Sequence, residues 1–257
     1  MTDARSLLLF SRHARGRSYD LGKMDFRGLV GAFFTYPTVL LYLGLSAAAG
    51  YGAVRYGILR MPVQAIGLGI LTFLVYAVVW YVLHRWVLHS TLLFRSPLTA
   101  RLFKRVHYDH HQDPHQMAVL FGSPATTLPT IVAITWPMGW AVAGTAGSFC
   151  AVFAGVTITL FYEFSHCCCH LNYTPRQAWL VRVKRLHMAH HFHNEVGNYG
   201  IVSFWPDRLL GTLHEDPSTQ PRSPTVLNIG YDEEAADRYP WVAALSASAA
   251  AKTGKPD

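Results

Sequence analysis

Long runs of apolar residues that contain almost no Asp, Glu, Lys or Arg dominate this chain. Four such runs occur, at roughly residues 29–53, 61–83, 124–143 and 146–164. A helix needs about 20 mostly apolar residues to cross the hydrocarbon core of a bilayer, and each run is close to that length or longer. The pattern therefore predicts an all-α integral membrane protein with about four transmembrane helices.

The last two runs are almost continuous. From Gln116 to Tyr162 no residue is charged, and Gly144 and Gly147 lie where the two runs meet. Glycine tolerates the backbone conformations of tight turns better than any other residue. We therefore expect two spans joined by a tight turn around these glycines.

The segments outside the runs define the expected domain organisation. Residues 1–28 form a polar and basic N-terminal segment, residues 29–214 the membrane domain, and residues 215–257 a polar tail. The first run is too long for the apolar core of a cleaved signal peptide, so we expect a retained span. The tail is rich in Pro, Ser, Thr, Ala and charge, which favours loose packing or disorder.

Composition and charge agree with a membrane protein. Of the 257 residues, 51% are hydrophobic and 14% charged, which is too apolar for an ordinary soluble protein of this size. The net charge is +7, but the basic residues flank apolar runs and form no continuous stripe, so we expect no nucleic-acid partner. With four spans, 20 of the 22 Lys and Arg residues fall on one side, opposite Arg55 and Arg60. The positive-inside rule makes the crowded side cytoplasmic.

Ten of the 14 histidines form four short clusters at the ends of apolar runs, and all lie on the predicted cytoplasmic side. The clusters are HRWVLH at 84–89, HYDHH at 107–111, HCCCH at 166–170 and HMAHH at 187–191. Residues at i, i+3 and i+4 share one face of a helix, so each HxxHH presents three imidazoles to one side. On an ideal α-helix His84 and His89 are about 140° apart, so this pair either bridges a pocket or lies where the helix ends.

These imidazoles predict a metal centre with two ions. Imidazole is a common ligand of iron, zinc, copper and nickel, and ten imidazoles are too many for one ion. In each HxxHH the outer pair can bind one ion while the middle histidine turns toward the other. We predict one ion on His84, His89, His107, His111 and His190, and a second on His110, His166, His170, His187 and His191.

Polar residues next to the clusters are candidates to accept the second ring N–H of a ligating histidine. Glu163 is the strongest, because it lies three residues before His166 at the end of an apolar run, where an unpaired acid is costly. We predict a catalytic role for Glu163. Further candidates for supporting roles are Asp109, Asp113, His115, His193, Asn194 and Asp207. Among these, Asp113 and Asp207 can equally cap a turn or a helix.

The motifs resemble those of the membrane fatty acid hydroxylase and sterol desaturase superfamily, whose pattern is HxxxxH or HxxxH, HxxHH, HxxxH and HxxHH. The match runs from Leu83 to Leu213 and includes the stretches FYEFSHCCCH and NYGIVSFWPDRLLGTL. Within the superfamily the chain is most similar to the fatty acid 2-hydroxylases. The resemblance implies a cytoplasmic histidine-rich helical cap with a non-haem di-iron centre, which activates O2 and inserts one oxygen atom into a C–H bond of a lipid.

The expected cofactor and partners agree with this resemblance. Two iron ions are expected, because C–H oxidation needs a redox metal and a zinc hydrolase needs fewer ligands. Zinc can nevertheless replace ferrous iron in purified protein. The expected partners are a lipid substrate, the membrane, O2 and a separate electron donor of the cytochrome b5, ferredoxin or flavoprotein reductase type. A separate donor is expected because the sequence contains no haem-binding His-Pro-Gly-Gly.

Two other functions fit the same residues. A lipid or sterol desaturase would use the same di-iron centre and differ only in a second hydrogen abstraction, so the number of histidines does not exclude it. A metal-binding membrane transporter is less favoured, because transport ligands lie near the bilayer midplane on broken helices and these clusters lie at one surface.

Overall fold

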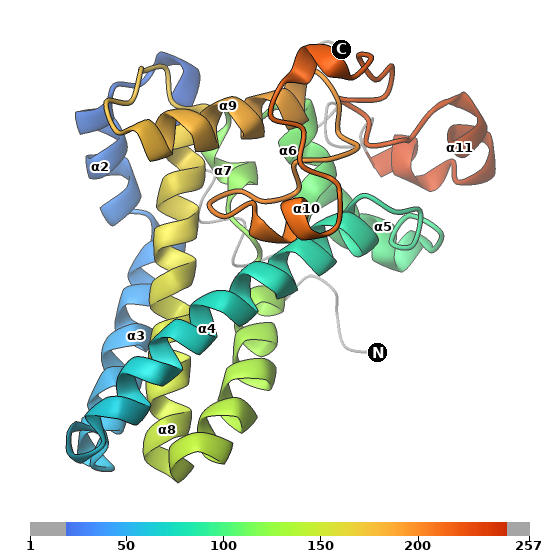
Figure 1. Ribbon diagram of the computed structural model, residues 1–257. Helices are drawn as coiled ribbons and strands as arrows, with labels where there is room; N and C mark the ends of the chain where they lie inside the picture. Colours follow the sequence, from blue (N-terminus) through green and yellow to red (C-terminus); the bar gives the residue numbers. More distant parts are fainter. Residues whose placement is uncertain (1–18, 246–257) are drawn as a thin grey trace. The chain divides into compact units, whose positions relative to one another are not determined.

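The computed structural model describes residues 19–245, and the regular structure in that range is helical (Figure 1). The chain divides into two compact units that alternate along the sequence. Of the residues that the structure describes, the first unit comprises 19–79 and Gln116–Thr174, and the second comprises Trp80–His115 and 175–245.

The first unit contains the longest helices. Its helices are η2 (Leu21–Lys23), α2 (Phe26–Phe34), α3 (Pro37–Arg55), η3 (Ile58–Arg60), most of α4 (Pro62–Leu83), α7 (Met117–Leu120) and α8 (Pro124–His170). The second unit has shorter helices joined by longer loops. They are η4 (His84–Leu88), α5 (Pro97–Phe103), η5 (Lys104–Tyr108), α6 (Asp109–Gln112), α9 (Ala178–Phe192), α10 (Trp205–Leu209), η6 (Pro217–Thr219) and α11 (Glu233–Arg238).

Three helical stretches of the described residues are long and apolar enough to cross a membrane, where the sequence predicted about four spans. They are Pro37–Arg55, Pro62–Leu88 and Met117–His170. Large apolar side chains point outward along α4, where Val63, Ile66 and Ile70 are 78%, 65% and 59% exposed. An apolar surface of this kind suits contact with lipid and not with water.

The third stretch accounts for the difference in number, because it contains both of the last two predicted runs. Its helix α8 leaves helical geometry at Ala143 and Gly144, where Gly144 has φ +56°, and then doubles back (Figure 1). The turn is where the sequence predicted it, although Gly147 lies already inside the second arm. There Gly147 packs against the backbone of Gly139 in the first arm, and Ser148 Oγ donates to the carbonyl of Trp136 at 2.9 Å.

Helix α3 packs against α8, and small side chains allow a close approach. Tyr42 on α3 packs with Ile131 and Val156 from the two arms of α8, and all three are buried. Near the other end of α3, the Phe149 ring lies directly against the backbone of Gly52. Packing of small residues against backbone is typical of helix contacts within membranes.

The predicted start of the first span, at residue 29, is wrong. The chain forms a separate short helix, α2, and the membrane-length helix α3 begins only at Pro37. Proline disfavours helical backbone in the preceding residue, and Tyr36 accordingly has extended φ and ψ of −74° and 130°. The absence of charge could not reveal this break, although Pro37 in the sequence is a signal for it.

The expectation of a loosely packed tail is wrong for residues 215–245. Ile229, Tyr231 and Val242 are buried in a cluster with Phe94 and Phe103 of the second unit. The indole Nε1 of Trp241 also donates to the carbonyl of Phe94 at 2.8 Å. A few large apolar residues therefore fold this segment despite its polar composition. Residues 246–257, and residues 1–18 of the predicted N-terminal segment, lie outside the described range.

Candidate metal centre

Five of the predicted ligands come together within the second unit. His84 and His89 flank the turn after α4, His107 lies in η5, His111 in α6 and His190 in α9. One ring nitrogen from each of the five lies within 4.8 Å of those of the others, so the group could hold a metal ion. We call these five residues the first histidine set.

Two π-helical turns orient the first histidine set. The segment His84–Leu88 is π-helical, and the backbone N–H of His89 donates to the carbonyl of His84 at 3.0 Å. A π-turn brings residues five apart onto one face, which resolves the spacing that an ideal α-helix leaves open. A second π-turn, Lys104–Tyr108, contains His107 and precedes His111. Such turns are frequent at functional sites.

The ε-nitrogens of this set are spaced as ligands of one ion. The Nε2 of His84 lies 3.1 Å from the Nε2 of His107 and 3.1 Å from that of His89, and the Nε2 atoms of His89 and His107 are 2.7 Å apart. With a metal–nitrogen distance of about 2.1 Å, ligands at right angles are about 3 Å apart. The residues present therefore fit a single ion with an all-nitrogen shell.

Backbone carbonyls hold three of these rings from behind. The Nδ1 of His84 lies 2.5 Å from the carbonyl of Tyr199, that of His190 lies 2.8 Å from Gly197 O, and that of His111 lies 3.0 Å from Val226 O. A carbonyl only accepts, so each Nδ1 carries the proton and each Nε2 keeps its lone pair for a metal. Among the described residues, the buried Nε2 atoms of His111 and His190 have no hydrogen-bond partner.

The other five histidines are divided between the two units. His110, His187 and His191 lie together in the second unit, where the His191 ring centroid is 4.5 Å from that of His110 and 4.6 Å from that of His187. His166 and His170 lie on α8 in the first unit, with ring centroids 5.1 Å apart. We call these five the second histidine set. Within the second unit, His111 of the first set stacks on His191 of the second, with ring centroids 4.1 Å apart.

Burial favours the neutral form of five of these imidazoles. It lowers the pKa of His190 to about 4 and that of His110 to about 3. Burial, with the charge of neighbouring histidines, also lowers the pKa of His89, His107 and His111 well below the usual value. A metal ligand must be deprotonated, so at neutral pH these five rings are in the form that binds an ion.

A tight loop, residues 197–200, supplies two of the three carbonyls. Gly197 has φ +133° and leaves no room for a Cβ beside the ring of His214. Asn198 also has positive φ, and its backbone N–H donates to Thr212 O at 2.9 Å. Tyr199 then packs edge-on against the histidines, with its ring centroid 5.6 Å from that of His84. The loop is therefore shaped by glycine, by pairing with residues 212–214 and by the ring of Tyr199.

The third carbonyl comes from the C-terminal segment 220–228. Its Thr225 Oγ1 donates to Glu195 Oε1 at 2.7 Å, and the Nε2 of His193 donates to Gln220 O at 2.8 Å. Gln112 Nε2 on α6 donates to Leu227 O at 2.7 Å. These bonds hold the segment in place, so that the carbonyl of Val226 lies beside the ring of His111. His111 directly precedes Gln112 in the sequence.

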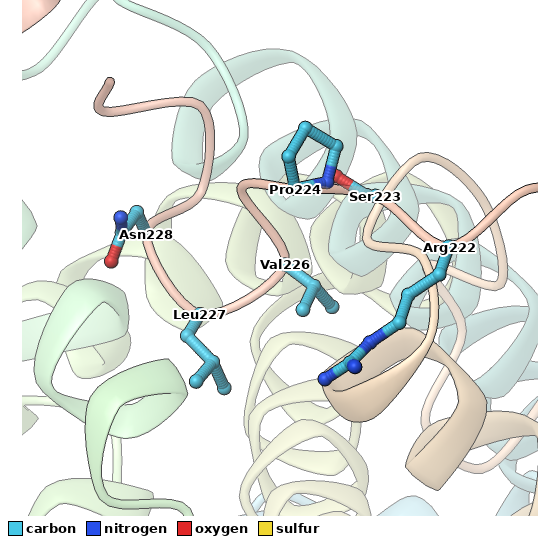
Figure 2. A pocket seen from close by; sticks show the side chains of 6 residues that line it. All are labelled: Arg222, Ser223, Pro224, Val226, Leu227 and Asn228. Atoms are coloured by element: carbon cyan, nitrogen blue, oxygen red, sulfur yellow. The ribbon is translucent and has the colours of Figure 1, made fainter. Parts of the chain in front are cut away.

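The same segment lines a pocket. Its lining residues are Arg222, Ser223, Pro224, Val226, Leu227 and Asn228. Figure 2 shows the side chains of Arg222, Val226 and Leu227 pointing to the same side of the segment. Val226 therefore lines the pocket with its side chain and accepts a hydrogen bond from His111 with its carbonyl.

The three carboxylates predicted near the clusters lie on α8, at the start of α6 and directly after α6. Glu163 is half-buried on α8, and its Oε1 accepts the backbone N–H of Gly122 at 3.2 Å. Asp109 forms an ion pair with Lys104, and Asp113 is exposed. The carbonyls that hold the histidines carry no signal in the residue type, which is why sequence reasoning missed them. The pair of glycines around Asn198 and Tyr199 is the one local sign of an unusual loop.

The remaining candidates also lie in the second unit. Asn194 Nδ2 donates to Pro221 O at 2.9 Å, and His115 stacks on Phe192 with ring centroids 6.2 Å apart. Asp207 is fully buried and accepts hydrogen bonds from the backbone of Tyr199 and Gly200. It therefore supports the loop that holds histidines, and not a histidine ring.

Known proteins resemble this chain in sequence and in fold. A dihydroceramide fatty acyl 2-hydroxylase, FAH2, of Arabidopsis thaliana is 26% identical over 178 residues, which cover 69% of each chain. A fatty acid 2-hydroxylase of Rattus norvegicus is 26% identical over 60% of this chain, but over only 42% of its own length. A solved structure of scs7p, in which only the hydroxylase domain is visible, gives a TM-score of 0.57 at 20% identity, covering 79% of this chain and 71% of that one. That structural similarity concerns the fold alone.

The family of this chain is identified by a match to the sequence model for fatty acid hydroxylases. The match spans residues 69–212, which include all four histidine clusters. Families of this kind are lipid-modifying oxidoreductases with a metal centre, in agreement with the buried histidines and the apolar helices. Because the match covers more than half of the chain, this protein belongs to the fatty acid hydroxylase family.

Proposed function

We propose that this protein is an O2-dependent di-iron monooxygenase that hydroxylates a fatty acyl chain. The observation that carries the proposal is the first histidine set, in which five buried ring nitrogens lie within 4.8 Å of one another. Five nitrogen ligands leave a coordination position for oxygen, whereas a catalytic zinc site of a hydrolase usually has three protein ligands. The acyl substrate is proposed from the relatives, whose names specify fatty acids and dihydroceramide acyl chains hydroxylated at position 2.

The second histidine set would hold the second iron ion. His110, His187 and His191 supply three rings in the second unit, and the HxxxH of α8 supplies His166 and His170 in the first. This ligand assignment follows from the spacing of the motifs. The catalytic role predicted for Glu163, three residues before His166, is part of the same proposal.

The protein's own residues would hold the ions, orient the ligands and exclude water. When bound, two iron ions would supply the redox chemistry for O2 activation and C–H oxidation. Neutral imidazoles with Nδ1 bonded to carbonyls present lone pairs in fixed directions, and His84, His107, His111 and His190 are at most 5% exposed. A dry site matters because a reactive oxidant must meet the lipid and not water.

We further propose that the two arms of α8 cross the membrane separately, which would give four crossings with the histidine sets on the cytoplasmic side. This orientation rests on the excess of Lys and Arg in the segments between the spans. A separate electron donor, of the cytochrome b5, ferredoxin or flavoprotein type, would then act from the cytoplasm. The basic character of that side suits an acidic donor protein.

The test is lipid analysis of cells that express the protein under isotopically heavy O2, with the His107→Ala variant as the inactive control. The proposal predicts an acyl lipid that is heavier by one heavy oxygen atom and is absent with the variant. A product lighter by two hydrogen atoms would identify a desaturase. Metal uptake into vesicles without O2 consumption would identify a transporter, and either result would overturn the proposal.

A further inference from the structure

Asp207 is a buried acid of the second unit, and both of its carboxylate oxygens accept hydrogen bonds. Its side chain is 0% exposed, and its Oδ1 accepts the N–H of Tyr199 at 2.8 Å while its Oδ2 accepts the N–H of Gly200 at 2.9 Å. Thr212 Oγ1 also donates to Oδ1 at 2.9 Å. A buried carboxylate is costly without such donors, so the loop and the acid stabilise each other. The same loop turns two carbonyls toward histidine rings.

We propose that Asp207 is a positioning residue for the first histidine set. By fixing the N–H groups of Tyr199 and Gly200, its carboxylate sets the direction of the loop carbonyls. The carbonyl of Tyr199 holds Nδ1 of His84 at 2.5 Å, and that of Gly197 holds Nδ1 of His190 at 2.8 Å. The inference rests on the proposed function, because it concerns the ion that this set would bind.

A chain of donors extends the support to the end of α4. Arg85 donates to the Tyr81 hydroxyl at 2.6 Å, and that hydroxyl lies 3.0 Å from Thr212 Oγ1. Since Thr212 donates its proton to Asp207, Tyr81 must donate to Thr212. The chain therefore runs in one direction toward the carboxylate, from a residue adjacent in sequence to His84. Charge-assisted bonds of this kind are stronger than those between neutral groups.

An isosteric change at Asp207 separates positioning from packing. Asp207→Asn keeps the volume and one oxygen, but turns an NH2 group toward donors that need an acceptor. We expect the loop carbonyls to shift away from His84 and His190. Asp232→Asn is the matched control, because Asp232 also accepts a backbone N–H, that of Ala235 at 2.9 Å, at the start of α11. Thr212→Val is a milder second variant that removes one donor.

The measurement is anaerobic titration of the full-length, detergent-solubilised protein with Co2+ as a spectroscopic probe. Loss of a supporting bond behind a ligand typically lowers metal affinity by about 10–100-fold. We expect a reduction of this size for one of two Co2+ ions in Asp207→Asn, with the other ion unaffected. A smaller reduction is expected in Thr212→Val, and none in Asp232→Asn. Thermal melting of the metal-free variants reports on folding independently.

The outcomes separate this inference from the proposed function. If the wild-type protein binds no Co2+ at the histidines, the proposed function fails and the role of Asp207 fails with it. If the wild-type protein binds two ions and Asp207→Asn binds both equally well, only the positioning role is overturned. Equal weakening of both ions together with a lowered melting temperature would make Asp207 a structural residue, which also overturns it. Should Asp207→Asn not fold, Thr212→Val decides by the same criterion.

Discussion

The two units of this protein maintain their structure in different ways. In the first unit, long helices pack through small residues and buried apolar side chains, as where Gly52 meets Phe149. In the second unit, short helices and turns carry eight of the ten clustered histidines, and loop carbonyls at Gly197, Tyr199 and Val226 fix three of the rings. The difference teaches that folding and metal binding depend on separable contacts. Substitutions in the first unit should change stability, and those in the loops should change metal binding.

The largest effect is expected from removing a ligand. His107→Ala should lower both the hydroxylation rate and the affinity for one metal ion by at least about 100-fold. Loss of a ligand should lower metal affinity at least as much as loss of a residue that hydrogen-bonds to a ligand. Product analysis and metal content measure the two effects. His115→Ala is the control, because His115 is only half-buried and stacks on Phe192. Equal activity of both variants would contradict the assignment of His107.

A tight helix contact in the first unit should show the opposite behaviour. Gly147→Ala places a Cβ against the backbone carbonyl of Gly139, which should destabilise the fold by about 1–3 kcal/mol. Metal content per folded chain should not change. Gly67→Ala on α4 is the control, because its Cβ meets nothing within 4 Å. Denaturation in detergent compares the two, and identical stability would show that the two arms of α8 do not pack closely at Gly147.

The C-terminal segment 220–228 should behave like the other loops. Thr225→Val removes the hydrogen bond to Glu195 and should loosen the carbonyl of Val226 behind His111. We expect faster loss of one ion to a chelator, by less than about 10-fold, since the carbonyl itself remains. Thr219→Val, which removes a bond to Asp216 O, is the matched control. Equal rates for the two variants would show that the segment does not support the site.

The smallest effect concerns an ion pair at the surface. Glu215 bonds to Arg182 and Arg185, which lowers the pKa of its carboxyl. A lowered carboxyl pKa adds stability above the unfolded value of about 4.5, and that stability is lost as the pH falls through the folded value. Glu215→Gln should therefore cost less than about 1 kcal/mol at pH 7, and the difference should vanish in acid. A difference that persists at low pH would point to packing in place of charge.

Sequence could predict features that repeat or that lack charge. The apolar runs predict the long helices, and the two glycines predict the turn at Gly144. The HxxHH spacing also predicts that His107 and His111 belong to one histidine set and His110 to the other, and the ring nitrogens of the structure fall into the same groups. Side-chain chemistry and helical periodicity determine all of these, so a single sequence contains them.

Backbone conformation accounts for what sequence reasoning missed. The π-turn at His84–Leu88 aligns two histidines that an ideal helix would separate. The carbonyls of Gly197 and Val226 are likewise properties of the main chain, whereas the break before Pro37 has a signal in the sequence, the proline itself. The burial of Ile229 and Val242 was hidden by the polar composition of the segment around them.

The central claim is that the first histidine set binds one iron ion and the second set another. Anomalous X-ray diffraction at the iron edge, from crystals of the full-length protein loaded with Fe2+, tests it directly. We predict two peaks, one of them about 2.1 Å from ring nitrogens of His84, His89, His107, His111 and His190. A single iron peak, or peaks away from these rings, would contradict the account.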